Sequence, residues 1–117
     1  MVAVTGKVVL IVEDDPSLRL LCRVNLELEQ FVVHEAATIA DARTEVAKER
    51  PAVVFLDVFL GGDETDGLLA ELRESGIPVV VVTGSDPDAY RDRADGVLGK
   101  PFAPDELVAA AHRHIVR

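Results

Sequence analysis

The chain of 117 residues is long enough for one domain with its own core, and its hydrophobic content of 49% is typical of a globular protein. Its net charge of −9 argues against binding nucleic acid through a basic face, because neutralising phosphates requires an excess of Lys and Arg. No apolar run approaches the roughly 20 residues that span a bilayer, and Met1 to Lys7 lacks the apolar stretch of a secretory signal, so we expect a cytoplasmic protein without membrane contact.

Short runs rich in β-branched residues alternate along the chain with stretches of helical periodicity, which is the pattern of successive βαβ units. The runs are almost continuously apolar, as expected for parallel strands that are buried on both faces of a sheet. The predicted strands are residues 7–12, 31–35, 52–57, 78–83 and 96–99. The sequence therefore predicts an α/β fold in which helices cover a five-stranded parallel sheet.

Local signals mark the starts of the predicted helices. Asp15 and Pro16 supply a cap and a first-turn proline to the first helix. Thr38 followed by Asp41 resembles a capping box for the second, and Asp66 is predicted to cap the third. The predicted helices run from Pro16 to about residue 29, from Thr38 to near residue 50, from Asp66 to about residue 75, and onward from Pro104.

Residues 84–95, between the last two predicted strands, contain only a small and weakly apolar segment. A helix of one or two turns is the most that this segment can form. Because it offers little apolar surface for packing, we expect it to be mobile. Neither a repeat nor a linker interrupts the chain, so we predict a single domain over residues 1–117.

Three acidic residues follow two of the predicted strands. Glu13 and Asp14 come directly after the first strand, and Asp57 closes the third. The carboxyl ends of parallel strands meet at one edge of an open sheet, so we expect these acids to converge there. Carboxylates this close repel one another unless a cation joins them, and Mg²⁺ prefers such oxygen ligands. The sequence therefore predicts a magnesium site suited to phosphoryl chemistry.

Four short regions of the chain resemble the signature regions of receiver domains from two-component response regulators. They are residues 12–16, 56–58, 82–84 and 99–102, and each lies at the end of a predicted strand. The resemblance covers nearly the whole chain. It implies a doubly wound, flavodoxin-like fold of the CheY type with strand order 2-1-3-4-5 and, here, a short or disordered fourth helix.

The resemblance implies a phosphoacceptor and a metal site. Asp57 would attack the phosphorus of a phosphohistidine on a sensor histidine kinase or phosphotransfer protein and become an acyl phosphate. Asp14 would bind Mg²⁺ directly, Glu13 would act through a metal-bound water, and the backbone carbonyl of Phe59 would add another oxygen. Such a domain is not an enzyme for separate substrates, since it catalyses only its own phosphorylation and dephosphorylation.

Two further residues would contact the phosphoryl group. The resemblance implies that the Thr83 hydroxyl hydrogen-bonds one phosphoryl oxygen and that Lys100 pairs with another, helped by a cis bond between Lys100 and Pro101. A hydroxyl and an ammonium aimed at the charge that develops on these oxygens stabilise the transition state. The expected output is a change of shape that a downstream protein partner reads, from a monomer or weak dimer.

Several positions depart from the common receiver pattern. Val97 stands where most receivers carry a Tyr or Phe that switches rotamer on activation, and a Gly-Gly pair replaces the usual Pro-containing loop. Residues 35–38, 57–62, 76–78 and 83–84 resemble the alphaproteobacterial single-domain receivers known by the FATGUY motif, which have a short or disordered fourth helix. Val81 and Val82 stand where that branch has Phe and Ala.

Other interpretations of these residues remain open. Taken alone, Glu13 and Asp14 are better explained as acids that favour a helix N-terminus. An aspartate-nucleophile phosphatase, or a metal site of the topoisomerase-primase type, would need a second acid two residues after Asp57, where Phe59 stands. A binding module with the receiver fold that signals without phosphate is kept open by Val97.

Overall fold

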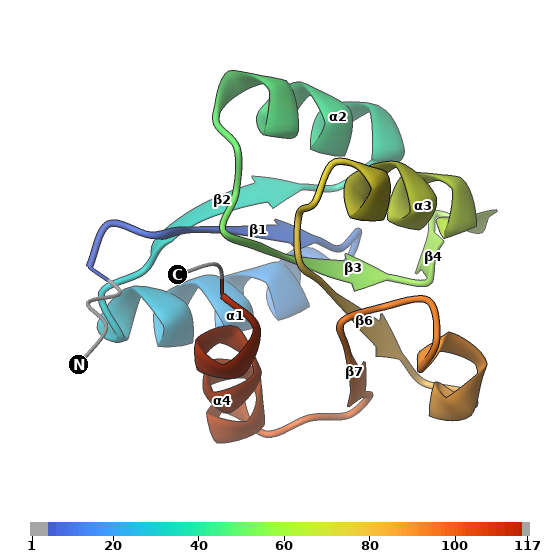
Figure 1. Cartoon of the computed structure of the whole chain (residues 1–117). Helices are drawn as coiled ribbons and strands as arrows, with labels where there is room; N and C mark the ends of the chain where they lie inside the picture. Colours follow the sequence, from blue (N-terminus) through green and yellow to red (C-terminus); the bar gives the residue numbers. More distant parts are fainter. Residues whose placement is uncertain (1–4, 116–117) are drawn as a thin grey trace.

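A five-stranded parallel sheet forms the centre of the molecule, with the strand order β2-β1-β3-β6-β7 (Figure 1). The computed structural model describes residues 5–115, so both ends of the predicted 1–117 domain, including Met1 to Val4, lie outside the described residues. The predicted doubly wound order is confirmed. Among the described residues, none of the helices is both long and apolar enough to cross a membrane.

The element boundaries lie close to the predicted ones. The strands of the sheet are β1 (Val8–Val12), β2 (Val32–Ala36), β3 (Val53–Asp57), β6 (Val79–Thr83) and β7 (Gly96–Gly99). The helices are α1 (Pro16–Leu28), α2 (Ile39–Lys48), α3 (Asp66–Glu74) and α4 (Pro104–His114). The first four strands begin one residue later than predicted. Lys7 and Ala52 each contribute only a single backbone hydrogen bond to the neighbouring strand, so they lie just outside the ladder.

Side chains of the central strands alternate between two apolar layers. In β1, Leu10 and Val12 pack with α2 and α3, whereas Val9 and Ile11 pack with α1 and α4. This alternation follows from the two-residue period of a strand. Figure 1 shows the resulting three layers, with α2 and α3 above the sheet and α1 and α4 below it. The continuously apolar strands are therefore explained by burial on both faces.

Side-chain caps fix the starts of two helices as predicted. The Asp15 carboxylate accepts hydrogen bonds from the amides of Ser17 and Leu18 at the start of α1. The Thr38 hydroxyl accepts one from the Asp41 amide at the start of α2. The prediction that Asp66 caps the third helix is wrong, because Asp66 is already the first helical residue of α3.

The chain between β3 and α3 forms a small hairpin that the sequence did not predict. Strands β4 (Phe59–Leu60) and β5 (Asp63–Glu64) pair antiparallel. Gly61 and Gly62 connect them with φ angles of 57° and 90°, which residues with a side chain rarely adopt. The Gly-Gly pair therefore allows the tight turn between the two strands.

The predicted short fourth helix is confirmed as a single 3₁₀ turn, η1 (Pro87–Tyr90). Tyr90 is half-buried and packs against the apolar layer of α2 and α3. Arg93 stacks over the Tyr90 ring at 5.1 Å and donates a hydrogen bond of 2.5 Å to Asp66. The side chains of Tyr90 and Arg93 thus help attach this segment to the rest of the fold, as does that of Asp95, which accepts a hydrogen bond from the Val79 amide. The mobility of the segment stays a prediction.

Gly96→Ala in β7 should destabilise the fold by about 1–3 kcal/mol, the usual cost of inserting a methyl group into a filled space. A Cβ at Gly96 would lie 2.5 Å from His114 Nε2, so the imidazole would have to move. Gly99→Ala is the matched control, because no heavy atom lies within 4 Å of its Cβ position. Urea unfolding measures both. Equal stabilities of the two variants would contradict the predicted clash with His114. So would a loss of stability on Gly96→Ala that is just as large when His114 has also been replaced by Ala.

Candidate functional site

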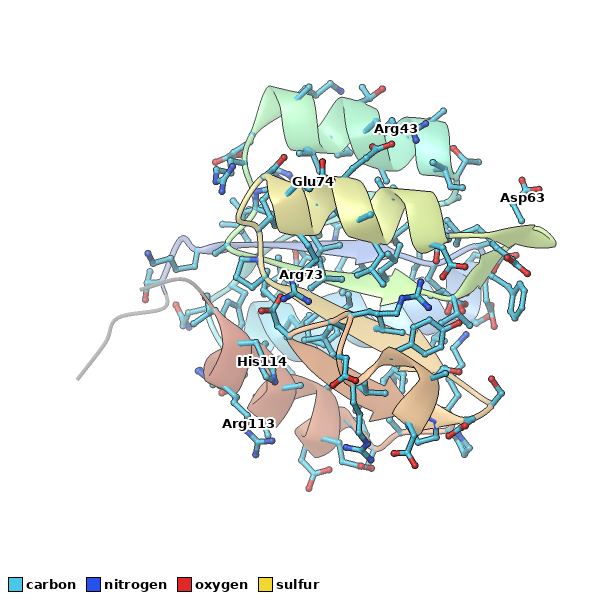
Figure 2. All side chains as sticks on the ribbon, turned by 45° about the vertical axis from the view of Figure 1, so that its right-hand side comes forward. Arg43, Asp63, Arg73, Glu74, Arg113 and His114 are labelled. Carbon is cyan, nitrogen blue, oxygen red and sulfur yellow. The ribbon has the colours of Figure 1, made fainter. Side chains whose placement is uncertain are left out.

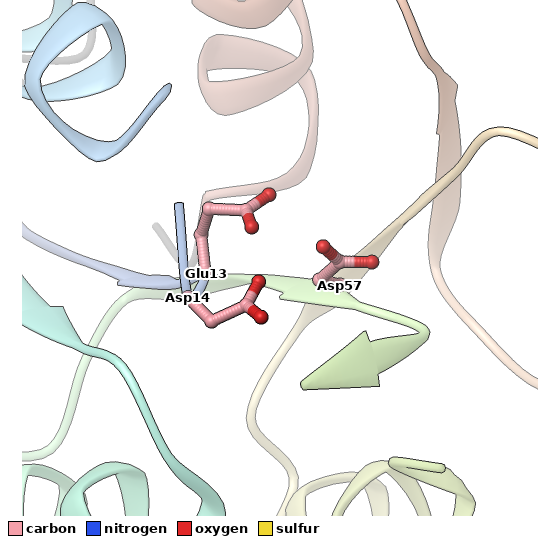
Figure 3. Close-up of side chains that lie close together, drawn as sticks. All are labelled: Glu13, Asp14 and Asp57. Atoms are coloured by element: carbon pink, nitrogen blue, oxygen red, sulfur yellow. The ribbon is translucent and has the colours of Figure 1, made fainter. Parts of the chain in front are cut away.

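The three acids converge where the sequence analysis predicted, at the carboxyl ends of β1 and β3 (Figure 3). Glu13 and Asp14 follow β1, and Asp57 is the last residue of the adjacent strand β3. One carboxylate oxygen from each residue lies within 4.8 Å of the others. Glu13 and Asp57 are buried, whereas Asp14 is exposed. Because Asp15 caps α1, Glu13 and Asp14 are not needed for that role.

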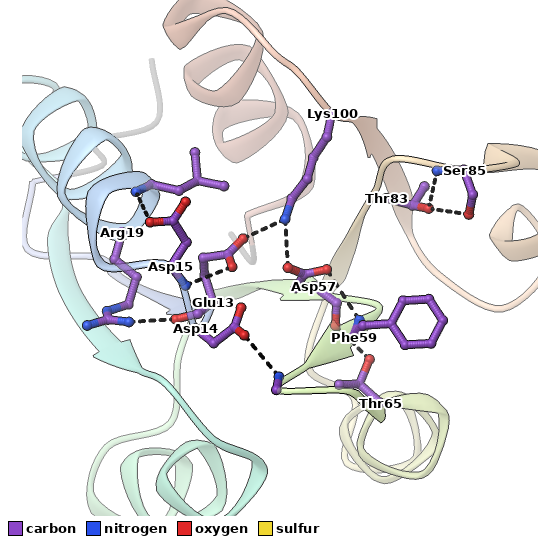
Figure 4. Close-up of polar contacts among 12 residues, drawn as sticks. Glu13, Asp14, Asp15, Arg19, Asp57, Phe59, Thr65, Thr83, Ser85 and Lys100 are labelled. Atoms are coloured by element: carbon purple, nitrogen blue, oxygen red, sulfur yellow. Dashed lines mark hydrogen bonds and ion pairs between the residues drawn. The ribbon is translucent and has the colours of Figure 1, made fainter.

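Lys100 lies between two of these acids, as Figure 4 shows. Its Nζ donates hydrogen bonds to Glu13 Oε1 at 2.8 Å and to Asp57 Oδ2 at 2.7 Å. The backbone amide of Lys100 also donates to the Thr83 carbonyl at 2.8 Å, which extends the pairing of β6 with β7. The bond between Lys100 and Pro101 is cis, as the resemblance implied. The ammonium group thus balances part of the negative charge at the sheet edge.

Burial and charge change the proton affinities of the site. Desolvation of the buried Glu13 carboxyl raises its pKa from 4.5 to about 7, although the hydrogen bond from Lys100 partly offsets this effect. The pKa of Asp14 is lowered, first by the Glu13 side chain and then by the Gly61 amide. Desolvation lowers the pKa of Lys100, but hydrogen bonds to Asp57 and Glu13 outweigh it and leave the pKa raised. Lys100 therefore stays charged at neutral pH.

In metal-free buffer, Glu13 should make the fold less stable as the pH rises from about 4.5 to about 7. The folded protein holds the Glu13 proton more tightly than the unfolded chain, whose pKa is near 4.5. The stabilisation is therefore fully present below the unfolded pKa and is lost as the pH passes the folded one. Urea unfolding of the wild type and of Glu13→Gln measures this effect. Over this pH range the free energy of unfolding of the wild type should fall by up to about 3 kcal/mol relative to that of Glu13→Gln. A difference that does not vary with pH would contradict the raised pKa.

Thr83 and Phe59 lie next to the acidic cluster, Thr83 with its side-chain hydroxyl and Phe59 with its backbone amide. Thr83 is the buried last residue of β6, and its hydroxyl lies 3.1 Å from Ser85 Oγ and accepts a hydrogen bond from the Ser85 amide. The Phe59 amide donates a hydrogen bond of 3.3 Å to Asp57 Oδ1, while the Phe59 ring is half exposed. The structure thus brings both residues to the site, and the ligand role of the Phe59 carbonyl stays a prediction.

Three residues that support the site were missed in the sequence. The buried Thr65 donates a hydrogen bond of 2.7 Å to the Asp57 carbonyl, and the Gly61 amide donates one of 2.9 Å to Asp14. Arg19 in α1 donates to the Glu13 carbonyl at 2.9 Å. The glycine pair was a signal for the hairpin turn. Arg19 and Thr65 carried no local signal, because a helical arginine and a threonine before a helix are common at surfaces.

Comparisons with known proteins agree with this geometry. The family described as response regulator receiver domain matches residues 9–112. The DNA-binding response regulator MtrA of Mycolicibacterium smegmatis is 37% identical over 93% of this chain and 50% of its own length. The KDP operon transcriptional regulatory protein KdpE of Escherichia coli is 38% identical over 91% of this chain and 52% of its own. The chain therefore spans about half the length of these curated relatives.

Solved structures share the same fold. The receiver domain of NtrX from Brucella abortus superposes with a TM-score of 0.82 at 28% identity, covering 90% of this chain and 95% of that one. The chemotaxis protein CheY4 of Vibrio cholerae gives a TM-score of 0.85 at 23% identity, covering 95% of this chain and 100% of that one, and it shows the fold alone. The family match covers nearly all of the sheet and both helix layers. The chain therefore belongs to the response regulator receiver domain family.

Proposed function

We propose that Asp57 accepts a phosphoryl group from a phosphohistidine of a sensor histidine kinase or phosphotransfer protein. A carboxylate oxygen of Asp57 forms the new O–P bond, the P–N bond of the phosphohistidine breaks, and the electron pair leaves with the imidazole. Asp57 is suited to this role because it belongs to the acidic cluster, closes β3 and contacts Lys100. The phosphorylated residue is an acyl phosphate, which water later hydrolyses.

The residues around Asp57 fit a magnesium ion and a developing negative charge. Glu13, Asp14 and Asp57, with the Phe59 carbonyl, would hold Mg²⁺, since carboxylate and carbonyl oxygens are its preferred ligands. When bound, the ion supplies positive charge beside the phosphoryl oxygens. Lys100 already reaches Asp57 and would pair with a phosphoryl oxygen. The catalysis serves only the chain's own phosphorylation and dephosphorylation.

We propose that the output is a shift in the population of conformers of residues 84–95. The Thr83 hydroxyl interacts with Ser85 at the start of this segment, and a phosphoryl oxygen on Asp57 would compete for it. The far end of the segment is attached through Arg93, which contacts Asp66, and through Asp95, whose carboxylate accepts a hydrogen bond from the Val79 amide. The population of conformers shifts when phosphorylation favours the contacts of one conformer over those of another. A downstream protein partner would read the new surface.

The contact of Lys100 with both Glu13 and Asp57 carries this proposal, because it aligns an ammonium group with the acid that would react. The test is intact mass after incubation with acetyl phosphate, with Mg²⁺ or with EDTA. We expect the gain of one phosphoryl group with Mg²⁺ only, together with changed amide hydrogen exchange in residues 84–95. No gain, with Mg²⁺ binding also absent, would favour a phosphate-independent binding module on the same fold.

We further propose that the chain belongs to the FATGUY branch of receivers and acts in the cytoplasm, as a monomer or weak dimer. The single turn of η1 supports the branch assignment, because it replaces a full helix between β6 and β7. The motif residues 35–38 and 57–62 support it as well. In this branch, receivers serve stress and stimulus signalling through histidine kinases, and we propose the same role here.

A further inference from the structure

The peptide group between Glu13 and Asp14 joins two of the three acids of the cluster. Its carbonyl oxygen, which belongs to Glu13, accepts a hydrogen bond of 2.9 Å from Nη1 of Arg19 (Figure 4). Because a peptide group is planar, the direction of this carbonyl also sets the position of the Asp14 Cα atom, from which the Asp14 carboxylate projects. Arg19 therefore constrains the placement of one acid through the backbone of the other.

Arg19 is itself held by the neighbouring strand β2. Its Nε donates a hydrogen bond of 3.2 Å to Oε1 of Glu35, and only 21% of the Arg19 side chain is exposed. The guanidinium is planar and rigid, so its contact with Glu35 also fixes the nitrogen that reaches the Glu13 carbonyl. The Glu13 amide donates a hydrogen bond of 3.0 Å to the Ala36 carbonyl. The backbone of Glu13 is thus tied to β2 at both its amide and its carbonyl.

Arg23, one turn further along α1, shows what the contact of Arg19 adds. The Arg23 guanidinium also pairs with Glu35, and it donates a hydrogen bond of 3.0 Å to the Val33 carbonyl. Both arginines therefore attach α1 to β2. Within residues 5–115, Arg19 hydrogen-bonds a residue of the acidic cluster and Arg23 does not. The two side chains share a structural role, and Arg19 has a second contact at the site.

We propose that Arg19 is a positioning residue for the Mg²⁺ site. One carboxylate oxygen from each of the three acids lies within 4.8 Å of the others, so the ligands are already gathered at one point. By fixing the peptide between Glu13 and Asp14, Arg19 keeps them there and lowers the cost of ordering them when the ion binds. Partners that orient metal ligands typically change metal affinity by about 10- to 100-fold. This role rests on the proposed function, since it takes the acidic cluster to be a Mg²⁺ site.

The charge of Arg19 alone predicts the opposite effect on Mg²⁺ binding. Arg19→Ala removes a positive charge close to a site for a cation, and the Coulomb repulsion between the guanidinium and the ion disappears with it. Charge alone would therefore make Arg19→Ala bind Mg²⁺ more tightly than the wild type does. Loss of positioning should instead weaken binding by about 10- to 100-fold. The direction of the change in affinity separates the two effects.

The test is a titration of Mg²⁺ into the unphosphorylated full chain, followed through the nuclear magnetic resonance signals of the backbone amides. Arg23→Ala is the matched control, because it removes the same charge from the same helix and also takes a partner from Glu35. Arg43→Ala controls for net charge, since Arg43 lies on α2 and pairs with Glu71 on α3 (Figure 2). Both controls should bind Mg²⁺ at least as tightly as the wild type.

Arg19→Lys is a second, milder variant that keeps the charge and most of the side-chain length. Its ammonium group can still donate to the Glu13 carbonyl, but it lacks the planar fork that also holds Glu35. It should therefore bind Mg²⁺ more weakly than the wild type and more tightly than Arg19→Ala. Urea unfolding in EDTA checks that each variant is folded, and if Arg19→Ala is not, the loss of affinity in Arg19→Lys carries the test.

Two results would overturn the proposed role of Arg19. One is a Mg²⁺ affinity of the folded Arg19 variants that equals or exceeds that of the wild type, and the other is an equal loss of affinity in Arg23→Ala. A wild type that binds no Mg²⁺ would overturn the metal site together with this role. Failure of acetyl phosphate to modify a chain that does bind Mg²⁺ would count against phosphorylation alone, so the two failures are distinguishable.

Discussion

Asp57→Asn should abolish phosphorylation by acetyl phosphate, because an amide lacks the charged oxygen that attacks phosphorus. The substitution also replaces one of the three carboxylates that would hold Mg²⁺. The loss should be complete rather than partial, since no other acid of the cluster shares the position of Asp57 between Lys100 and the Phe59 amide. Intact mass in the presence of Mg²⁺ measures the result.

Asp63→Asn is the matched control for this variant. Asp63 is an exposed residue of the β4–β5 hairpin, so the same chemical change there should leave phosphorylation intact. Circular dichroism should show Asp57→Asn folded, because the amide is nearly isosteric and removes a negative charge from an acidic cluster. If Asp57→Asn were phosphorylated to the wild-type level, Asp57 could not be the phosphoacceptor, and Asp14 would be the next residue to test.

Phe55→Ala should lower the free energy of unfolding by about 3–5 kcal/mol, the usual loss for a buried aromatic side chain. Phe55 lies in the middle of β3 with 2% of its surface exposed and packs in the layer of α1 and α4. Phe59→Ala, four positions later, is the matched control, because the Phe59 ring is 50% exposed and its loss should cost under about 1 kcal/mol. Urea unfolding compares the two, and equal losses would contradict the assigned burial.

The fold was predictable because its strands carry an unambiguous pattern. The run Val79–Thr83 begins with four consecutive valines that are all buried, as expected for a strand of a parallel sheet that is covered on both faces. The third helix start was less predictable, since Asp66 and the preceding Thr65 both have the chemistry of a cap. Which of them begins a helix depends on tertiary contacts, here the bond of Thr65 to the Asp57 carbonyl.

The residues of the site likewise fall into those that the sequence could predict and those that it could not. Glu13, Asp14 and Asp57 were predictable because topology alone brings the ends of neighbouring strands together. The residues that hold them were not, because the hydrogen bond from Gly61 to Asp14 joins positions far apart in sequence and depends on how the hairpin lies. Arg19 similarly gains its role only when α1 packs beside the Glu13 carbonyl. Supporting contacts of this kind follow from packing and leave no local pattern.

The central place of β1 in the sheet also governs how the chain must fold. β1 needs β3 as a partner, and Val9 pairs with Val53 far along the chain, so the sheet closes only after costly long-range contacts form. Until then, the consecutive valines of Val79–Thr83 are open to pairing with another molecule. Pro78, which lacks an amide hydrogen, and the net charge of −9 both oppose such association. Refolding yield should therefore depend on whether the sheet closes within one molecule before two unfolded molecules collide. A lower protein concentration should raise the yield.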